Sequence, residues 1–169
     1  MASNFLKLSL LFVILVLLQV LVLNQISFLG YATPFLYIYF IIKLPIGINR
    51  YYATLLGFIM GFTIDVFCNT PGVNAAATTF VAFFAQSIQN LFFQREDHDS
   101  FVPSLSLLNL DFAKYMVTMV LLHHVALLLI ESFSYQNIDI VLLRIVLSSA
   151  LTCILILAIE GFSSKKKIV

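Results

Sequence analysis

Six apolar stretches, separated by short polar intervals, fill almost the whole of this 169-residue chain. A helix of about 20 apolar residues is long enough to cross the hydrocarbon core of a bilayer. The pattern therefore predicts an all-α, polytopic membrane protein with six transmembrane helices, forming a single domain over residues 1–169. The expected spans are residues 8–23, 26–42, 51–68, 73–93, 112–130 and 138–159.

The second stretch differs from the others because Gly30 and Pro34 interrupt it. Its regular part, residues 34–42, would rise only about 14 Å as a helix, against a hydrocarbon core of about 30 Å. Pro34 suits a first helical turn, where its missing N–H leaves no bond unmade. We therefore expect a short or broken helix here, rich in the tyrosines that are typical of membrane interfaces.

The first stretch has a second interpretation, as a cleaved signal peptide, because residues 30–32 loosely resemble a small-x-small cleavage site. However, the apolar run is long, Lys7 is the only charged side chain before it, and further spans follow. We expect a retained membrane anchor.

The polar intervals are too short to fold as domains. Residues 69–72, Asn-Thr-Pro-Gly, have the composition of a tight turn and predict an antiparallel hairpin of the third and fourth spans. A short polar loop around residues 134–137 links the last two spans. The longest interval, residues 94–109, contains the charged run 95–99, which we expect to be a solvated loop.

Composition agrees with a lipid environment, since 62% of the residues are hydrophobic and 10% are charged. Soluble domains have roughly 45–50% and about 25%. The few cations are dispersed, and so they cannot form the basic stripe that nucleic-acid-binding proteins use. Cys68 and Cys153 fall at different depths, which argues against a disulfide and favours packing roles.

Cationic residues fall almost entirely on one side of the expected bundle. With the N-terminus inside, the inner segments hold Lys7, Lys43, Arg50, Arg95, Lys114 and the tail Lys165, Lys166 and Lys167. The two later outer turns contain no Lys or Arg, and only Arg144 departs from the pattern. The positive-inside rule therefore predicts that both termini are cytoplasmic.

Asp65 is the most informative single residue. It shares one helix face with Gly57 and Gly61, at i, i+4 and i+8. Small residues at this spacing allow a second helix backbone to approach closely. A carboxylate on that face must meet protein or water, because exposing it to lipid costs several kcal/mol. Three roles remain open: a group near the outer interface that is hydrated or caps the next turn, an intramembrane ion pair with Arg144, and a proton or substrate site. Glu131 is a rival acid for Arg144.

Other polar residues inside the spans suggest packing more than chemistry. His123 and His124 point about 100° apart on a helix, and each can be satisfied as a neutral ring by a hydroxyl or a carbonyl. The positions three and four residues after His123 are apolar, so we expect no metal site. The fourth span carries polar side chains that favour helix packing, with a ligand groove as the alternative: Asn74, Thr78, Thr79, Gln86, Gln89 and Asn90.

Known catalytic signatures are missing from the sequence: it has no phosphate-binding Gly-rich loop with Lys-Ser/Thr, no His-Glu-x-x-His and no Gly-x-Ser-x-Gly. We therefore expect neither an enzyme nor a cofactor. An intramembrane enzyme is the remaining enzymatic hypothesis, although the sequence offers no pair of residues with the spacing of a catalytic dyad.

The segment from 52 to 75 resembles the rod shape-determining protein MreD family. That family carries a Gly-x-x-x-Gly-x-x-x-Asp helix, a short turn, and then Gly-aliphatic-Asn-Ala at the start of the next helix. The matching residues here are Gly57, Gly61, Asp65, Gly72 and Asn74. Chain length, six expected spans and a short tail are also similar. The acidic 95–99 loop and the paired histidines depart from the pattern.

The resemblance implies a non-enzymatic inner-membrane scaffold of the bacterial cell-elongation complex, which supports peptidoglycan synthesis and cell shape. It implies binding to an MreC-type membrane protein, and indirect contact with MreB and with the elongation peptidoglycan glycosyltransferase and transpeptidase. The five matching residues would then serve helix packing or a partner interface. It also implies a fold similar to the substrate-binding component of energy-coupling factor transporters. That similarity suggests our alternative, a membrane component that binds a small molecule for a transporter.

Overall fold

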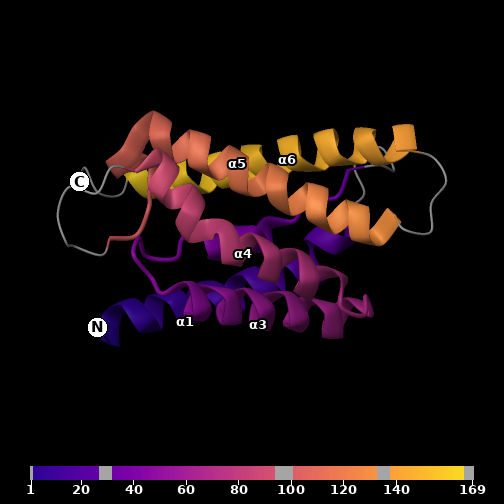
Figure 1. The fold of residues 1–169 in the computed structure, drawn as a ribbon, viewed down its shortest axis with the longest axis horizontal. Helices are drawn as coiled ribbons and strands as arrows, with labels where there is room; N and C mark the ends of the chain where they lie inside the picture. Colours follow the sequence, from indigo (N-terminus) through magenta and orange to yellow (C-terminus); the bar gives the residue numbers. More distant parts are fainter. Residues whose placement is uncertain (1, 27–31, 94–100, 133–137, 166–169) are drawn as a thin grey trace.

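The computed structural model describes residues 2–26, 32–93, 101–132 and 138–165, and this part of the chain is all-helical. The long helices lie side by side in an elongated bundle (Figure 1). In chain order the elements are α1 (Ala2–Leu21), η1 (Leu23–Gln25), η2 (Leu36–Ile38), α2 (Tyr39–Ile42), α3 (Arg50–Cys68), α4 (Val73–Phe92), α5 (Leu105–Glu131) and α6 (Ile138–Lys165).

Four helical segments are long and apolar enough to cross a membrane. They are Leu6–Gln25, Arg50–Cys68, Leu105–Glu131 and Ile138–Ser163. The expectation of an all-α protein with several helices that could cross a membrane is confirmed, whereas six spans are not established. The helix α4 has 20 residues but its polar side chains lower its mean hydropathy, and α2 has only four residues.

The bundle is apolar outside and partly polar inside. The outer face of α3 exposes large apolar or aromatic side chains to the surroundings, among them Tyr51, Phe62, Val66 and Phe67. Buried polar side chains, in contrast, come from every long helix: Gln19, Asp65, Asn74, Thr78, Gln89, His123, His124, Ser148, Ser149, Thr152 and Glu160. This inversion of the soluble pattern is the one that a lipid solvent favours.

Both ends of the bundle are defined by a buried charged residue. The helix α1 begins and α6 ends at the left of Figure 1. Glu160, which is buried near the end of α6, pairs with Lys43. We call this the Lys43 end. The turn between α3 and α4 lies at the opposite end with Asp65, and we call that the Asp65 end.

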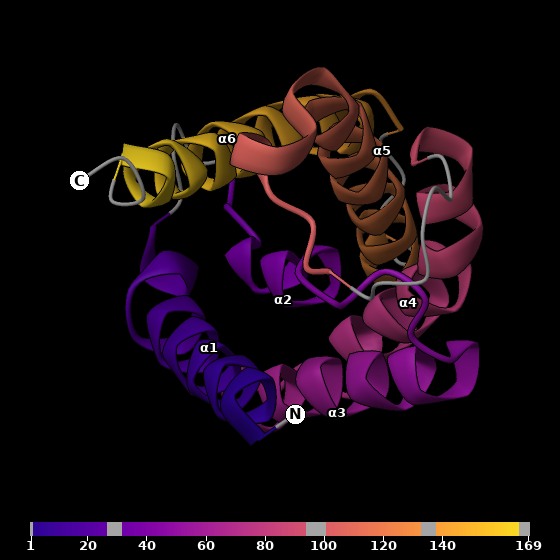
Figure 2. The ribbon, with the colours of Figure 1, turned by 90° about the vertical axis from the view of Figure 1, so that its left-hand side faces the viewer.

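Residues 32–44, which we call the central segment, run through the middle of the bundle, and Figure 2 shows α2 surrounded by the long helices. All residues from Leu36 to Ile42 are buried. The expected short or broken helix is therefore η2 and α2, preceded by a stretch that is not helical.

Side chains of α1 and α6 satisfy the backbone of this non-helical stretch. The N–H groups of Thr33 and Phe35 donate to the hydroxyls of Ser148 and Thr152, each at 3.1 Å. Gln19 accepts from the Leu36 N–H at 2.9 Å and donates to the Pro34 carbonyl at 3.0 Å. Irregular backbone at membrane depth is tolerated only when such partners exist.

Two helices start earlier than expected. The helix α1 extends back to Ala2 instead of residue 8, and α5 begins at Leu105 instead of residue 112. In α5 the backbone of Asn109 is non-helical, with φ 44° and ψ −116°, so the added turn meets the main helix at a kink. The expected span from 112 corresponds to the part of α5 that follows this kink.

The glycines of α3 set how closely α3 and α4 pack. A Cβ atom added at Gly57 would lie 2.6 Å from the Ala82 Cβ and 2.9 Å from the Thr78 carbonyl oxygen. One added at Gly61 would overlap the Thr78 hydroxyl and the Asn74 carbonyl oxygen, and would lie 2.6 Å from the Ala75 Cα. The small-residue face of α3 is thus covered by α4 of the same chain.

We expect Gly61→Ala to lower the free energy of unfolding in detergent by about 1–3 kcal/mol, the usual effect of overpacking a tight interface. The matched control is Gly161→Ala on α6, where an added Cβ meets nothing within 4 Å. Thermal unfolding followed by circular dichroism measures both. Equal stability of the two variants would mean that α3 and α4 do not pack this closely.

Candidate functional site

Asp65 lies near the end of α3 and caps the start of α4. Its side chain is only 5% exposed. One carboxylate oxygen, Oδ1, accepts from the Asn74 N–H at 3.0 Å, and the other, Oδ2, accepts from the Ala75 N–H at 2.8 Å. These are backbone donors of the first turn of α4, which have no partner within their own helix. A negative charge is also favoured at a helix N-terminus by the helix dipole.

The cap includes the turn that joins the two helices. The hydroxyl of Thr70 donates to Asp65 Oδ1 at 2.8 Å and accepts from Asn74 Nδ2 at 2.9 Å. Asn69 and Gly72 have positive φ, 54° and 83°, which reverse the chain direction within four residues. Glycine adopts this conformation without steric cost, and asparagine is among the residues that tolerate it best.

Asn74 connects the cap to the centre of the bundle. Its Nδ2 donates to Asp65 Oδ1 at 2.9 Å, and its Oδ1 accepts from the hydroxyl of Tyr37 at 2.6 Å. Tyr37 belongs to η2 and is completely buried. One asparagine therefore joins α3, α4 and the central segment.

Of the three roles that the sequence left open for Asp65, the structure selects the helix cap, in a buried rather than a hydrated setting. The expected ion pair between Asp65 and Arg144 is wrong: among the described residues, Arg144 pairs with Glu131 at 3.1 Å, the rival acid. The reason is that donors of the turn and of α4 occupy both oxygens of Asp65, whereas α5 and α6 place Glu131 and Arg144 next to each other.

The five motif residues divide into two groups. Asp65, Gly72 and Asn74 form the cap and its turn, and Gly57 and Gly61 lie farther along α3 against α4. All five therefore belong to the α3–α4 hairpin, through its cap, its turn or its helix packing.

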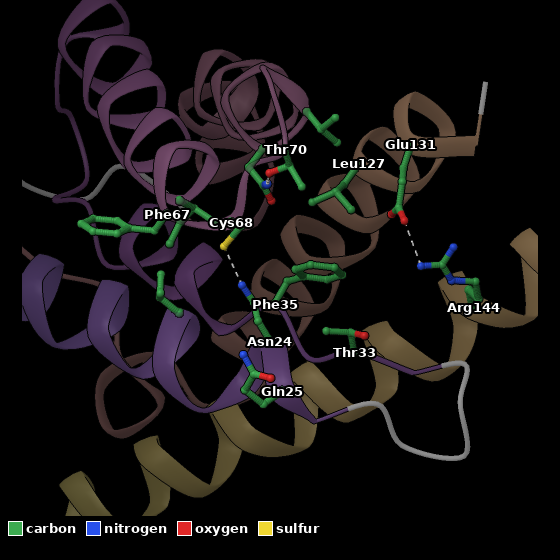
Figure 3. A pocket seen from close by; sticks show the side chains of 14 residues that line it. Asn24, Gln25, Thr33, Phe35, Phe67, Cys68, Thr70, Leu127, Glu131 and Arg144 are labelled. Carbon is green, nitrogen blue, oxygen red and sulfur yellow. Dashed lines mark hydrogen bonds and ion pairs between the residues drawn. The ribbon is translucent and has the colours of Figure 1, made fainter. Parts of the chain in front are cut away.

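A cavity of about 500 Å³ opens beside this cap at the Asp65 end. Figure 3 shows that Arg144 and Glu131 approach it from one side, and Asn24, Gln25 and Thr33 from another. Asn24 donates to the Cys68 sulfur at 2.7 Å. The lining combines one cation, one anion, amides and hydroxyls with apolar side chains such as Phe35 and Leu127, a mixture typical of small-molecule sites.

The two histidines of α5 differ in their environment. His124 lies 2.8 Å from the Val120 carbonyl through Nδ1 and 3.2 Å from the Thr152 hydroxyl through Nε2, as expected for a satisfied neutral ring. His123 is fully buried, and neither ring nitrogen has a hydrogen-bond partner among the described residues. It packs edge-on against the ring of Tyr37, with centroids 5.2 Å apart.

Sequence reasoning missed a second capping carboxylate, Glu160, because it falls just after the expected last span. Its side chain is 3% exposed and lies 2.5 Å from the Lys43 ammonium. The Glu160 carboxylate accepts from the hydroxyl of Tyr39 at 2.5 Å. It also accepts, at 3.1 Å, from the N–H of Leu105, which is the first residue of α5. The signal in the sequence that could have indicated this role is the position of Glu160, a single acidic residue directly after an apolar stretch.

We expect Asp65→Leu to destabilise the protein more than Asp65→Asn. Asn keeps one acceptor oxygen but turns an amide nitrogen toward the Ala75 N–H, and each buried donor left without a partner costs about 1–3 kcal/mol. Leu removes both acceptors. Unfolding in detergent should rank wild type above Asn and Asn above Leu, with the exposed Asp139→Asn as control. Wild-type stability of Asp65→Leu would refute the capping role.

Comparison with known proteins adds no relative. No family model, no curated protein and no solved structure matches this chain.

Proposed function

We propose that this chain is a non-enzymatic scaffold in the bacterial inner membrane, of the MreD type, that supports the cell-elongation complex and its peptidoglycan synthesis. The observation that carries the proposal is the α3–α4 unit. The residues on which the resemblance depends are not scattered matches, because together they build one close-packed hairpin with a buried cap. This is what we expect of a family motif that stabilises a fold, because its residues should contact one another in the structure.

The course of the chain supports six crossings. Thr33 contacts Ser148, Phe35 contacts Thr152, and Tyr39 contacts Glu160. Successive residues of the central segment thus contact successive residues of α6, and so the central segment runs along the bundle in the same direction as α6. The chain then passes through the bundle as α1, the central segment, α3, α4, α5 and α6, with α1 beginning and α6 ending at the Lys43 end.

A scaffold of this kind would meet its partners through the outer helix faces. The small-residue face of α3 is occupied by α4, and so an MreC-type partner would contact the outer face of α3 or another exposed helix face. The cap at the Asp65 end and the Lys43–Glu160 pair at the other end would keep those faces in fixed positions. Asp65 would act on the partner through the shape of the hairpin.

The cavity at the Asp65 end favours a second candidate, a membrane component that binds a small molecule for a transporter. The specific observation is the volume of the cavity, about 500 Å³, together with a lining that includes an arginine, a glutamate and several amides. A small molecule that stays bound through purification, and is lost from Arg144→Gln but not from Arg50→Gln, would favour this candidate over the scaffold.

For the scaffold we expect an MreC-type protein to copurify with the affinity-tagged chain from bacterial membranes. Asp65→Leu should reduce the recovered partner, per amount of folded chain, more than Asp65→Asn does, because Leu disturbs the α3–α4 unit more. The exposed Asp139→Asn serves as control. Quantitative mass spectrometry of the eluate measures the ratio. If wild-type chain and an unrelated multi-pass protein recover the same amount of MreC-type partner, the scaffold proposal fails.

Both termini should be cytoplasmic, because the expected inner segments hold most of the cations. A reporter that is active only in the cytoplasm should therefore be active when it is fused after Val169. A reporter at the same position that is active only in the periplasm would contradict this orientation.

A further inference from the structure

A second cavity, at the Lys43 end, has the composition of a lipid head-group site. It measures about 430 Å³ and lies between the start of α1 and the end of α6. Its lining combines cations, hydroxyls and apolar side chains: Lys7, Leu8, Leu11, Lys43, Val102, Ser104, Ser106, Leu107, Glu160 and Ser163. We propose that this cavity binds the phosphate of an anionic phospholipid, with an acyl chain along its apolar wall.

The charges that line the cavity leave it positive. Glu160 is buried and pairs with Lys43, so these two charges balance. Lys7 on α1 is exposed and makes no ion pair with any carboxylate in the described part of the chain. The lining thus holds two ammonium groups against one carboxylate, a net charge of +1.

The two lysines differ in how much of their hydrogen-bonding capacity is used. The Lys43 ammonium donates to Glu160 and, at 2.7 Å, to the Pro103 carbonyl. An ammonium has three donors, so one is left for a ligand. Lys7 donates to no residue in the described part of the chain. The hydroxyls of Ser104 and Ser106, 3.2 Å apart, add further donors for phosphate oxygens.

The apolar part of the lining indicates a lipid rather than a soluble phosphate. Leu8 and Leu11 line the cavity from α1, and Val102 and Leu107 line it from the chain at the start of α5. Leu107 is 56% exposed and Val102 is 37% exposed, so the cavity continues onto the apolar outer surface of the bundle. Figure 2, which faces the Lys43 end, shows α1 and α6 on opposite sides of this region. Basic pockets between membrane helices are known to bind phospholipid head groups.

The test measures lipids retained by the full chain in native mass spectrometry. Wild type, Lys7→Gln and Lys114→Gln are each exchanged into equal mixtures of phosphatidylglycerol and phosphatidylcholine with the same acyl chains. Lys114 is the matched control, because it is a lysine at the same end that pairs with Asp111 and does not line the cavity. Lys43 and Glu160 stay unchanged because they hold α5 in place.

We expect wild type and Lys114→Gln to retain more phosphatidylglycerol than phosphatidylcholine. The ratio of the two retained lipids should be about fivefold lower for Lys7→Gln, which is the effect of one lysine near an anionic lipid. Three results would overturn the proposal. Equal retention of the two lipids by wild type would show no head-group selectivity. Equal effects of Lys7→Gln and Lys114→Gln would show general surface attraction. Displacement of the lipid by millimolar glycerol phosphate would assign the cavity to soluble phosphate esters.

Discussion

Within a bilayer each backbone N–H needs a partner inside the protein. This constraint explains five of the buried polar side chains of the bundle, because each accepts from a backbone N–H outside its own helix: Gln19, Asp65, Ser148, Thr152 and Glu160. It is strictest where a helix begins, because the first turn has donors without helical partners. Two buried carboxylates accept from such donors, and each belongs to a different helix from the donor. Asp65 on α3 accepts from the start of α4, and Glu160 on α6 accepts from the start of α5. Each therefore fixes a helix end and the contact between two helices at once.

The same constraint accounts for the central segment. A stretch that leaves the helical conformation in the interior would be costly if its polar groups faced lipid. Here Gln19, Ser148 and Thr152 provide the missing donors and acceptors, and Tyr37 and Tyr39 tie η2 and α2 to Asn74 and Glu160. The capping carboxylates, the central segment and the surrounding helices are thus parts of one hydrogen-bonded network.

Local signals in the sequence predicted the helices, the α3–α4 turn and the close-packed glycine face, because periodicity, turn residues and small-residue spacing act over a few residues. The choice of partner for Arg144 was not predictable in this way. Asp65 and Glu131 lay at similar expected depths, and only the three-dimensional arrangement shows that donors from α4 already occupy Asp65. The role of Glu160 depended on Lys43 and Leu105, which are far away in sequence, and so local reasoning did not find it.

The assignment of the glycine face to internal packing changes how a scaffold of this kind would work. Gly57 and Gly61 touch α4, so they cannot also receive a partner helix without separating the hairpin. Recognition would then depend on side chains that face outward, whose positions are set by the buried network. A substitution at Asp65 would act on a partner only through the hairpin, and its effect on binding should follow its effect on stability. A substitution on the outer face of α3 should change binding while stability stays constant, and this difference separates a positioning residue from a contact residue.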